Sequence, residues 1–326
     1  MKKFKLSKFI QWRFNIFLYI IMGWSFAKFY IFLLGKIYFL FNRREKKIID
    51  KSIKDVISWV KREINIPEVS KNVFKGIFAH YYEKLFMAFE EKQKATEFLN
   101  KHVNSDNLVV VRTALLKGKG VIVITGHYGA IEYIPTLLAV NNIDISMIAK
   151  FKTSQLRNKI FKQAEKYKIR MIDAGNSGNV LKRAISELKE NRVLVTQCDE
   201  IEEWRPSLKK RTSFLGQVTG LDRTINILHK RTGAEVVFGV IHRYNLRNYK
   251  FIAYSYEQML KIIPHTNSNT VGEVVLKVLE QFICHYPEQW YQWKKYPDLI
   301  NLQDSESRVE ERSITNLFYP LFEKIA

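Results

Sequence analysis

The sequence predicts an α/β protein with a mostly parallel central sheet and flanking helices, preceded by an N-terminal membrane helix and a helical segment. Two observations support this class: short apolar runs alternate with helical stretches after residue 104, which predicts the sheet, and 47% of the 326 residues are hydrophobic, which is ample for a packed core. Such alternation is typical of parallel strands joined by crossover helices. A third observation, a long apolar run near the N-terminus, predicts the membrane helix. We expect three parts: an anchoring helix at 1–44, a main domain at 45–301 and a tail at 302–326.

Residues 14–41 form the apolar run, which is long enough to cross a hydrocarbon core of about 30 Å at about 1.5 Å per residue. Basic residues flank it at 1–13 and at 42–47, so charge does not choose an orientation. No small-residue cleavage site follows, so we expect the segment to be retained. A helical wheel gathers its polar residues in one narrow stripe: Ser25, Lys28 and Lys36. The helix could therefore lie in the membrane interface or span at a tilt, and a buried core helix is the alternative.

The elements of the main domain follow from periodicity. Residues 45–103 have apolar side chains at helical spacing, as in NVFKGIFAHYYEKLFMAF. Apolar runs then predict strands at 121–125, 145–149, 169–173, 192–196 and 234–241. The stretches TSQLRNKIFKQAEKY, VLKRAISELKE and GLDRTINILHKRTG predict the helices between them. The polar segment after 301 predicts a loosely held tail.

Composition limits the function classes. The chain has 53 basic and 32 acidic residues, a net charge of +21, which favours a polyanionic partner such as nucleic acid, an anionic membrane or an acidic protein. Its two cysteines, Cys198 and Cys284, exclude a disulfide scaffold and a cysteine-based metal cage. The sequence has no zinc-protease helix, phosphate-binding loop, dinucleotide fingerprint or Gly-x-Ser-x-Gly elbow, so we predict no metal and no cofactor.

One motif carries chemistry. The strand at 121–125 leads directly into Gly-His-Tyr-Gly-Ala-Ile-Glu, and sites in this fold class lie at the carboxyl ends of strands. Gly126 and Gly129 let the backbone turn sharply around His127. Glu132 follows in the first turns of the next helix, so its carboxylate could orient the imidazole while the other ring nitrogen takes a proton. A structural histidine is the alternative. With no nucleophile of its own, this pair predicts attack by a substrate hydroxyl.

The motif resembles the His-x4-Asp/Glu signature of the lysophospholipid acyltransferase superfamily, and more narrowly the bacterial lipid A late acyltransferase family. Further segments of the resemblance follow in the same order: Gln197–Glu200, Ser213–Gly216, Gly220–Leu221, His229–Val237 and Pro287–Lys295. The resemblance implies an acyltransferase domain at 45–301 and transfer of a fatty acyl chain from a thioester, on acyl carrier protein or coenzyme A, to a hydroxyl of a lipid or glycolipid acceptor. It also implies the cytoplasmic face of the inner membrane.

On this resemblance His127 is the general base and Glu132 its partner, and the oxyanion is held by amides near Gly126–Gly129 or by a cation. The substrate-binding candidates are Gly126, Tyr128, Gly129, Lys150, Lys166, Arg170, Asp199 and Glu200. The three cations lie where the family supplies an anion-binding arginine. A solvated helix face is the favoured alternative for each one alone, but we expect one of the three to point into the cleft. Asp199 and Glu200 could orient the acceptor or a cation, or be surface carboxylates. The family shows Arg-Pro where this chain has Lys150-Phe151, so the acceptor head group could differ.

The charge predicts an acidic carrier protein as the donor's carrier. Basic residues continue into the catalytic half of the chain at Lys209, Lys210, Arg211, Arg223, Lys230 and Arg231. A nucleic-acid-binding protein is a rival interpretation, but the chain has no zinc-finger or RNA-binding signature and its basic residues are spread throughout. A non-catalytic membrane scaffold is a second rival, against which the intact His127/Glu132 pair argues. We therefore expect no nucleic-acid partner.

Overall fold

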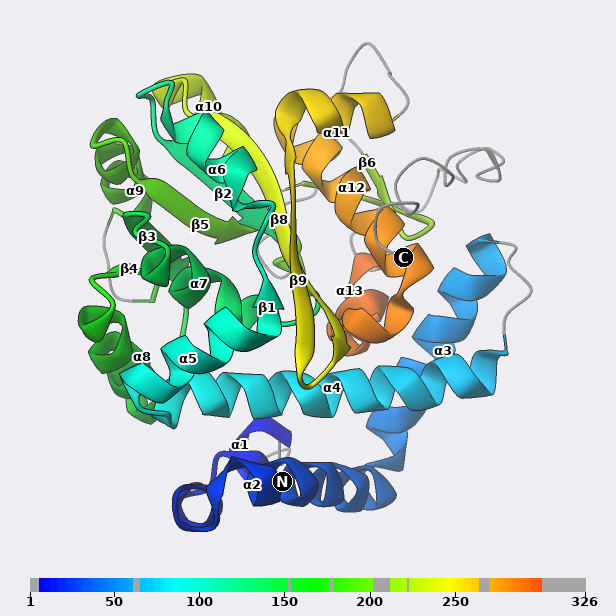
Figure 1. Cartoon of the computed structure of the whole chain (residues 1–326). Coiled ribbons are helices and arrows are strands. Elements are labelled where there is room, and N and C mark those ends of the chain that lie inside the picture. The colour runs from blue at the N-terminus through cyan, green and yellow to red at the C-terminus, as the bar shows by residue number, and fades with distance from the viewer. Residues whose placement is uncertain are drawn as a thin grey trace.

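The centre of the molecule is a seven-stranded sheet with the order β1-β9-β8-β2-β5-β3-β4 (Figure 1). The computed structural model describes residues 6–60, 65–151, 154–175, 179–201, 212–221, 223–263 and 270–300. The parallel strands are β2 (Val121–Thr125), β3 (Ile145–Ala149), β4 (Arg170–Asp173), β5 (Val193–Gln197) and β8 (Glu235–Asn245). Because all five run in one direction, their carboxyl ends lie along the same edge of the sheet.

Two further strands reverse the direction. β9 (Asn248–Ser255) pairs antiparallel with β8 as a hairpin, and the short β1 (Val103–Asn104) pairs parallel with β9. A separate antiparallel pair consists of β6 (Thr212–Phe214) and β7 (Gln217–Thr219). The α/β class and its mostly parallel sheet are confirmed. β9 was not among the strands predicted from the sequence, so the antiparallel side of the sheet was not expected.

Both faces of the sheet are covered, as the continuous apolar runs of the strands require. In β2, Val121 and Val123 belong to a core with α5 (Lys92–His102), α6 (Leu108–Leu115), α7 (Ile134–Val140) and α8 (Ser154–Lys166). Ile122 and Ile124 belong to the opposite core, with α9 (Val180–Lys189), α10 (Thr224–Thr232), α11 (Tyr256–Ile262) and α12 (Val271–His285). The period-2 alternation of side chains along a strand produces these two layers.

Helices also precede and follow the sheet. α3 (Arg43–Val60) and α4 (Ile66–Phe89) confirm the helical segment, and Figure 1 shows α4 crossing the molecule between the sheet and the N-terminal helices. Asn65 caps α4 by accepting a hydrogen bond from the Glu68 amide, with a proline in the first turn. After α12 the chain makes the short turns η3 (Pro287–Gln289) and η4 (Trp293–Lys295) and ends its described part with α13 (Tyr296–Ile300). The predicted tail at 302–326 lies outside the described residues.

The N-terminal helices α1 (Leu6–Ile10) and α2 (Arg13–Phe41) form a separate layer below α4, which we call the foot (Figure 1). α2 is long and apolar enough to cross a membrane. It is broken, however, at Gly23, whose φ of 78° is left-handed, a conformation that glycine adopts at no steric cost. Beyond the break α2 packs on α4: a Cβ on Gly35 would lie 2.3 Å from the Phe78 ring, so only glycine permits this approach.

Candidate active site

The loop after β2 is held by its own backbone amides. The His127 amide donates to the Asp199 carboxylate at 2.9 Å, and the Tyr128 amide donates to the Gly126 carbonyl at 2.7 Å. The amide of Gly129 donates to the Gln289 carbonyl, and that of Ala130 to the Ile241 carbonyl. These four amides are therefore already engaged, which leaves a cation as the better candidate for holding an oxyanion.

The two glycines permit close packing of this loop. A Cβ at Gly126 would meet the Leu279 side chain at 2.4 Å, and one at Gly129 would meet the Ile241 carbonyl oxygen at 1.9 Å. Gly129 also has a positive φ of 56°. Tyr128 is fully buried, with its hydroxyl 2.8 Å from Nδ1 of His242. Gly126, Tyr128 and Gly129 therefore shape the loop, and their role in substrate binding stays a prediction.

His127 is held by Asp199, a carboxylate that follows β5. Nδ1 of His127 lies 2.9 Å from Oδ1 of Asp199, and the Trp290 indole N–H donates to Oδ2 at 2.8 Å. Asp199 is fully buried. Burial alone would raise the pKa of its carboxyl, but the charge and hydrogen bonds of His127, together with the Trp290 bond, outweigh burial and lower it. An ionised Asp199 holds the proton on Nδ1, so Nε2 is the ring nitrogen that can exchange a proton with a ligand.

The Nε2 side of His127 is more open. Oε1 of Glu200 lies 3.3 Å from Nε2, and its other oxygen lies 3.8 Å from Nζ of Lys295. The side chain of Glu200 is 38% exposed, against 0% for Asp199. His127 is thus flanked by one fixed carboxylate, on Nδ1, and by one that solvent reaches, on Nε2.

The expected contact between Glu132 and His127 is not the one that the structure shows. Glu132 lies in η1 (Ile131–Tyr133), where Oε1 is 3.0 Å from Nζ of Lys84 and 3.9 Å from Nε2 of His80, both on α4. The 3₁₀ turn directs Glu132 toward α4, whereas parallel pairing of β2 with β5 brings Asp199 beneath the histidine. Asp199 was predicted to lie beside the site, but the role of partner to His127 was assigned to Glu132, which is nearer in the chain.

Tyr291 lies between the side chains around His127 and those around His80 on α4. Its ring stacks on His80, with centroids 3.6 Å apart, and meets the edge of the His127 ring at 5.3 Å. Burial, followed by the charges of Lys84 and His127, holds the pKa of His80 well below its usual range, so this imidazole is neutral. The sequence analysis missed His80 and Lys84 because no local motif marks them. Tyr291 and Trp290 belong to the Pro287–Lys295 segment of the resemblance.

A buried ion pair supports the loop from behind. Arg243 on β8 binds both carboxylate oxygens of Glu83 on α4, at 2.5 and 2.6 Å, and donates to the Gly129 carbonyl at 2.7 Å. The Gln289 amide group donates to the Arg243 carbonyl at 2.8 Å. One side chain thus ties α4, β8 and the histidine loop together. Trp290 and Trp293 are fully buried, so neither indole reaches the surface of the protein.

The cations named from the sequence do not gather at His127. Lys150 follows β3 at the carboxyl edge and is exposed. Lys166 ends α8, and Arg170 begins β4 at the amino edge, where it pairs with Glu187 at 3.1 Å and Glu190 at 2.5 Å. The expectation that one of the three points into the site fails for Lys166 and Arg170, because both precede the strand whose carboxyl end faces the site. Lys209, Lys210 and Arg211 lie outside the described residues.

Comparison with known protein families identifies the family of this chain. The family described as bacterial lipid A biosynthesis acyltransferase matches residues 2–295. The chain belongs to this family. It is therefore an acyltransferase, and membership disfavours the nucleic-acid-binding and scaffold alternatives. The match spans the foot, the sheet and the site around His127. No curated protein matches the sequence significantly.

Proposed function

We propose that this lipid A-type acyltransferase moves a fatty acyl chain from a thioester to a hydroxyl of a membrane lipid or glycolipid, with His127 as general base. Nε2 takes the proton of the acceptor hydroxyl as its oxygen attacks the thioester carbonyl carbon. The carbon–sulfur bond then breaks, the acyl ester remains on the acceptor, and the imidazolium returns the proton to the leaving thiolate. Asp199 keeps Nδ1 protonated and stabilises the imidazolium.

One observation carries this proposal: His127 has a buried carboxylate on Nδ1 and a partly exposed side at Nε2. That combination fixes the tautomer and leaves the basic nitrogen where a substrate can reach it. Glu200 would then swing aside or accept a hydrogen bond from the acceptor. Lys295, behind Glu200, is a candidate cation for the oxyanion. Glu132 stays in the proposal as the partner of Lys84 and His80, which border the same site.

The foot is the proposed membrane anchor. Its surface carries ten large apolar side chains that are 40% to 83% exposed: Trp12, Phe14, Phe17, Ile20, Ile21, Met22, Phe29, Leu33, Leu40 and Phe41. A soluble surface rarely exposes so many neighbouring apolar side chains. Because α2 docks on α4, we favour a foot that lies in the membrane interface over one that spans the membrane. We propose the cytoplasmic face of the inner membrane, where thioester donors are available.

Substitution of His127 tests the mechanism. We expect His127→Ala to lower kcat by about 10² to 10⁴-fold, the usual range for a general base, without lowering the melting temperature by more than a few degrees. His127→Gln should be equally inactive, and His102→Ala, at a histidine outside the site, should be fully active. Wild-type turnover in a folded His127→Ala protein would contradict the proposal. Lipid mass spectrometry of the products would name the acceptor and the chain length.

The donor's carrier is a second point to test. We propose acyl carrier protein over free coenzyme A thioester, because a basic surface would steer an acidic carrier. In detergent micelles, kcat/KM for the carrier-linked donor should fall by about 10 to 10³-fold between low and high salt, since the Debye length shrinks from about 10 Å at 0.1 M to about 3 Å at 1 M. Equal salt dependence for both donors would argue against a carrier protein.

A further inference from the structure

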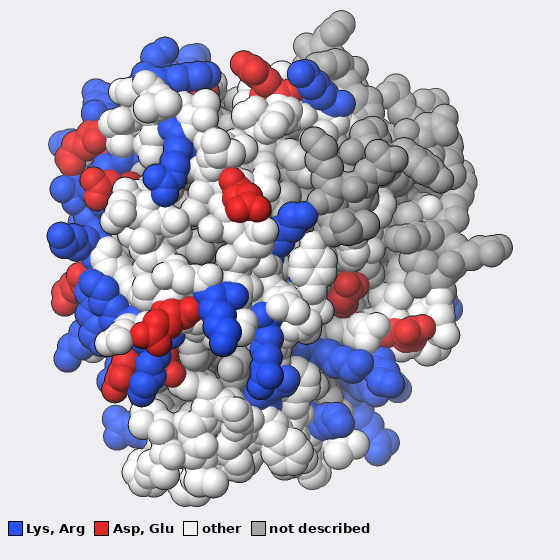
Figure 2. Space-filling model, in the orientation of Figure 1, with Lys and Arg blue, Asp and Glu red and all other residues white. Residues whose placement is uncertain are grey.

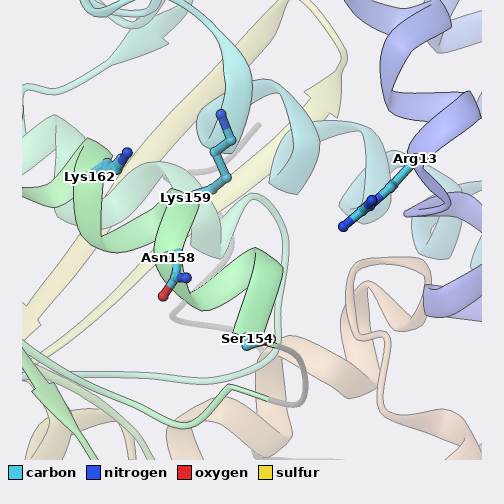
Figure 3. A pocket seen from close by; sticks show the side chains of 5 residues that line it. All are labelled: Arg13, Ser154, Asn158, Lys159 and Lys162. Atoms are coloured by element: carbon cyan, nitrogen blue, oxygen red, sulfur yellow. The ribbon is translucent and has the colours of Figure 1, made fainter.

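An open pocket lies between the foot and α8, at the beginning of α2. It has a volume of about 330 Å³ and is lined by Arg13, Ser154, Asn158, Lys159 and Lys162. Figure 3 shows Arg13 on the foot facing the other four residues, which lie along α8. Three of the five lining residues are cations and none is acidic. His127 does not line this cavity, so it is a different place from the proposed active site.

The three cations have little to balance them. In the part of the chain that the structure describes, no carboxylate lies within ion-pair distance of Arg13, Lys159 or Lys162, and the contact found for Lys159 is with the Phe89 ring, 5.6 Å from Nζ. The neighbouring Arg157, by contrast, pairs with Asp173 at 2.6 Å. Like charges that share one cavity repel each other, and a bound anion would relieve that repulsion.

The lining suits a phosphate group. A guanidinium offers a planar fork of donors that matches phosphate oxygens, and lysine ammonium groups add point charges. The Ser154 hydroxyl and the Asn158 amide are neutral donors that can complete such a site. Ser154 is the first residue of α8, and the first amides of a helix have no acceptor within the helix, which also favours an anion.

The position of the cavity identifies the source of the phosphate. Trp12 and Phe14, on either side of Arg13, are 62% and 53% exposed and belong to the apolar surface of the foot. In Figure 2 the foot, at the bottom of the view, is largely white, and Lys and Arg side chains gather on the surface above it. A molecule that fills the cavity with phosphate therefore lies beside a surface suited to hydrocarbon, which is the geometry of a lipid headgroup at an interface.

We propose that this cavity binds the headgroup phosphate of an anionic membrane lipid and so fixes the depth and tilt of the protein on the membrane. The proposal rests on membrane anchoring by the foot. An anchor alone requires only apolar contact and tolerates any lipid. The cavity adds a preference for lipids whose exposed phosphate carries net charge.

Vesicle binding of the full-length protein tests this proposal. Binding is measured by flotation with phosphatidylcholine vesicles and with vesicles in which part of that lipid is replaced by phosphatidylglycerol. We expect Lys159→Gln/Lys162→Gln to weaken binding to the anionic vesicles by about 30-fold, equivalent to about 1 kcal/mol for each cation near an anionic surface, and to leave binding to neutral vesicles unchanged. The matched control, Lys182→Gln/Lys189→Gln on α9, removes the same charge and should bind as the wild type does.

A third variant separates a built site from diffuse charge. Arg13→Lys keeps the charge but loses the guanidinium fork. A built phosphate site therefore predicts weaker binding to phosphatidylglycerol vesicles, whereas diffuse electrostatic attraction predicts the same binding as the wild type. Equal binding by Arg13→Lys and wild type, or an equal loss in the α9 control, would overturn the proposal. So would tight binding of inorganic phosphate in detergent without any lipid preference, or a defect confined to binding a purified acidic carrier protein.

The two proposals fail in different ways. Binding to neutral and anionic vesicles with the same affinity contradicts the phosphate site and leaves the anchor intact. Absence of binding to either kind of vesicle contradicts both, because the site is defined by its position beside the anchoring surface. Turnover with a detergent-solubilised acceptor is measured in a separate experiment. It tests the proposed role of His127 whatever the outcome of the vesicle experiments.

Discussion

The carboxyl edge of the sheet and the foot are built on opposite principles. Around His127, most polar side chains are buried, and Asp199 is fixed by hydrogen bonds from His127 and Trp290, although solvent reaches Glu200. The foot, residues 6–41, has no carboxylate and no histidine, and it exposes apolar side chains of a size that most proteins bury. Hydrogen bonds and ion pairs between distant elements position the first region. The second docks on α4 through apolar packing, as where Gly35 meets Phe78, and it also has hydrogen bonds of its own, such as that of the Tyr19 hydroxyl to the Ile10 carbonyl.

This difference implies that chemistry and attachment can be changed separately. A substitution at the carboxyl edge alters a proton position or a hydrogen bond without touching the apolar surface. A substitution on the exposed face of the foot changes affinity for lipid without reaching the imidazole. α4 lies between the two regions and contacts both, through Glu83 and Lys84 on one side and Phe78 on the other. A variant that changed both properties together would indicate that α4 transmits effects between them.

The largest effect should come from Asp199. Asp199→Asn replaces an acceptor for Nδ1–H with a side chain that favours the wrong tautomer, so we expect kcat to fall by about 10² to 10⁴-fold. Binding to vesicles should be unchanged. Steady-state kinetics in detergent micelles together with vesicle flotation would measure both properties.

Asp173→Asn is the matched control for this prediction. Asp173 also ends a parallel strand at the carboxyl edge, but it pairs with Arg157 rather than with His127. We expect it to retain most of the wild-type kcat. Equal losses in the two variants would mean that the edge as a whole responds to any lost carboxylate, and the role of Asp199 would have to be abandoned.

The outcome at Asp199 shows where sequence reasoning reaches its limit. The strand at 121–125, its carboxyl end and the importance of His127 all follow from local patterns, and the structure has the strand with those bounds. The partner of His127 does not follow, because Glu132 is five residues away while Asp199 is 72. Only the pairing of Thr125 with Gln197 brings Asp199 beneath the ring, and strand order cannot be read from periodicity.

The foot shows a second limit of a different kind. Hydropathy predicted an apolar helix over 14–41, and α2 covers Arg13–Phe41. The break at Gly23 escaped prediction, because an isolated glycine within an apolar run is compatible with a continuous helix. The docking of α2 on α4 was not predicted either, because it depends on Phe78, which lies far along the chain. β9 was missed because it pairs through a tight hairpin with a strand that was expected to end four residues earlier.

The foot should give the second-largest effect. Phe17→Glu/Ile21→Glu places two charges on side chains that are 59% and 61% exposed, so the fold should tolerate them. Loss of their apolar contact with lipid should weaken vesicle binding by about 30 to 100-fold, or about 2–3 kcal/mol. Turnover with a detergent-solubilised acceptor should stay within about twofold of the wild type, since neither residue lies near His127. Vesicle flotation and steady-state kinetics would measure the two quantities.

Leu116→Glu provides the control for the foot. Leu116 is 87% exposed and is on the catalytic domain, after α6, so the same kind of substitution there should leave vesicle binding unchanged. If Leu116→Glu weakened binding as much as the double variant, the membrane-facing surface would extend well beyond the foot. If neither variant weakened binding, the assignment of the foot as the anchor would be wrong.

The smallest effect should come from acid, which acts on the catalytic domain and not on the foot. His242 on β8 is buried against the Tyr128 hydroxyl, and burial, followed by the charges of Arg243 and Lys250, lowers its pKa from 6.5 to about 4. Between these values the unfolded chain binds a proton that the folded protein does not, so stability falls as pH falls, by about 2 kcal/mol between about pH 7 and pH 5. His80 contributes in the same direction. His242→Asn keeps an acceptor for the Tyr128 hydroxyl but cannot titrate. Thermal melts across this pH range should therefore show a shallower slope of stability against pH than the wild type, while His102→Asn should keep the wild-type slope.

A wild-type slope in His242→Asn would show that His242 is not held neutral by burial. Because the foot contains no group that titrates in this range, vesicle binding by the still-folded protein should not change with it.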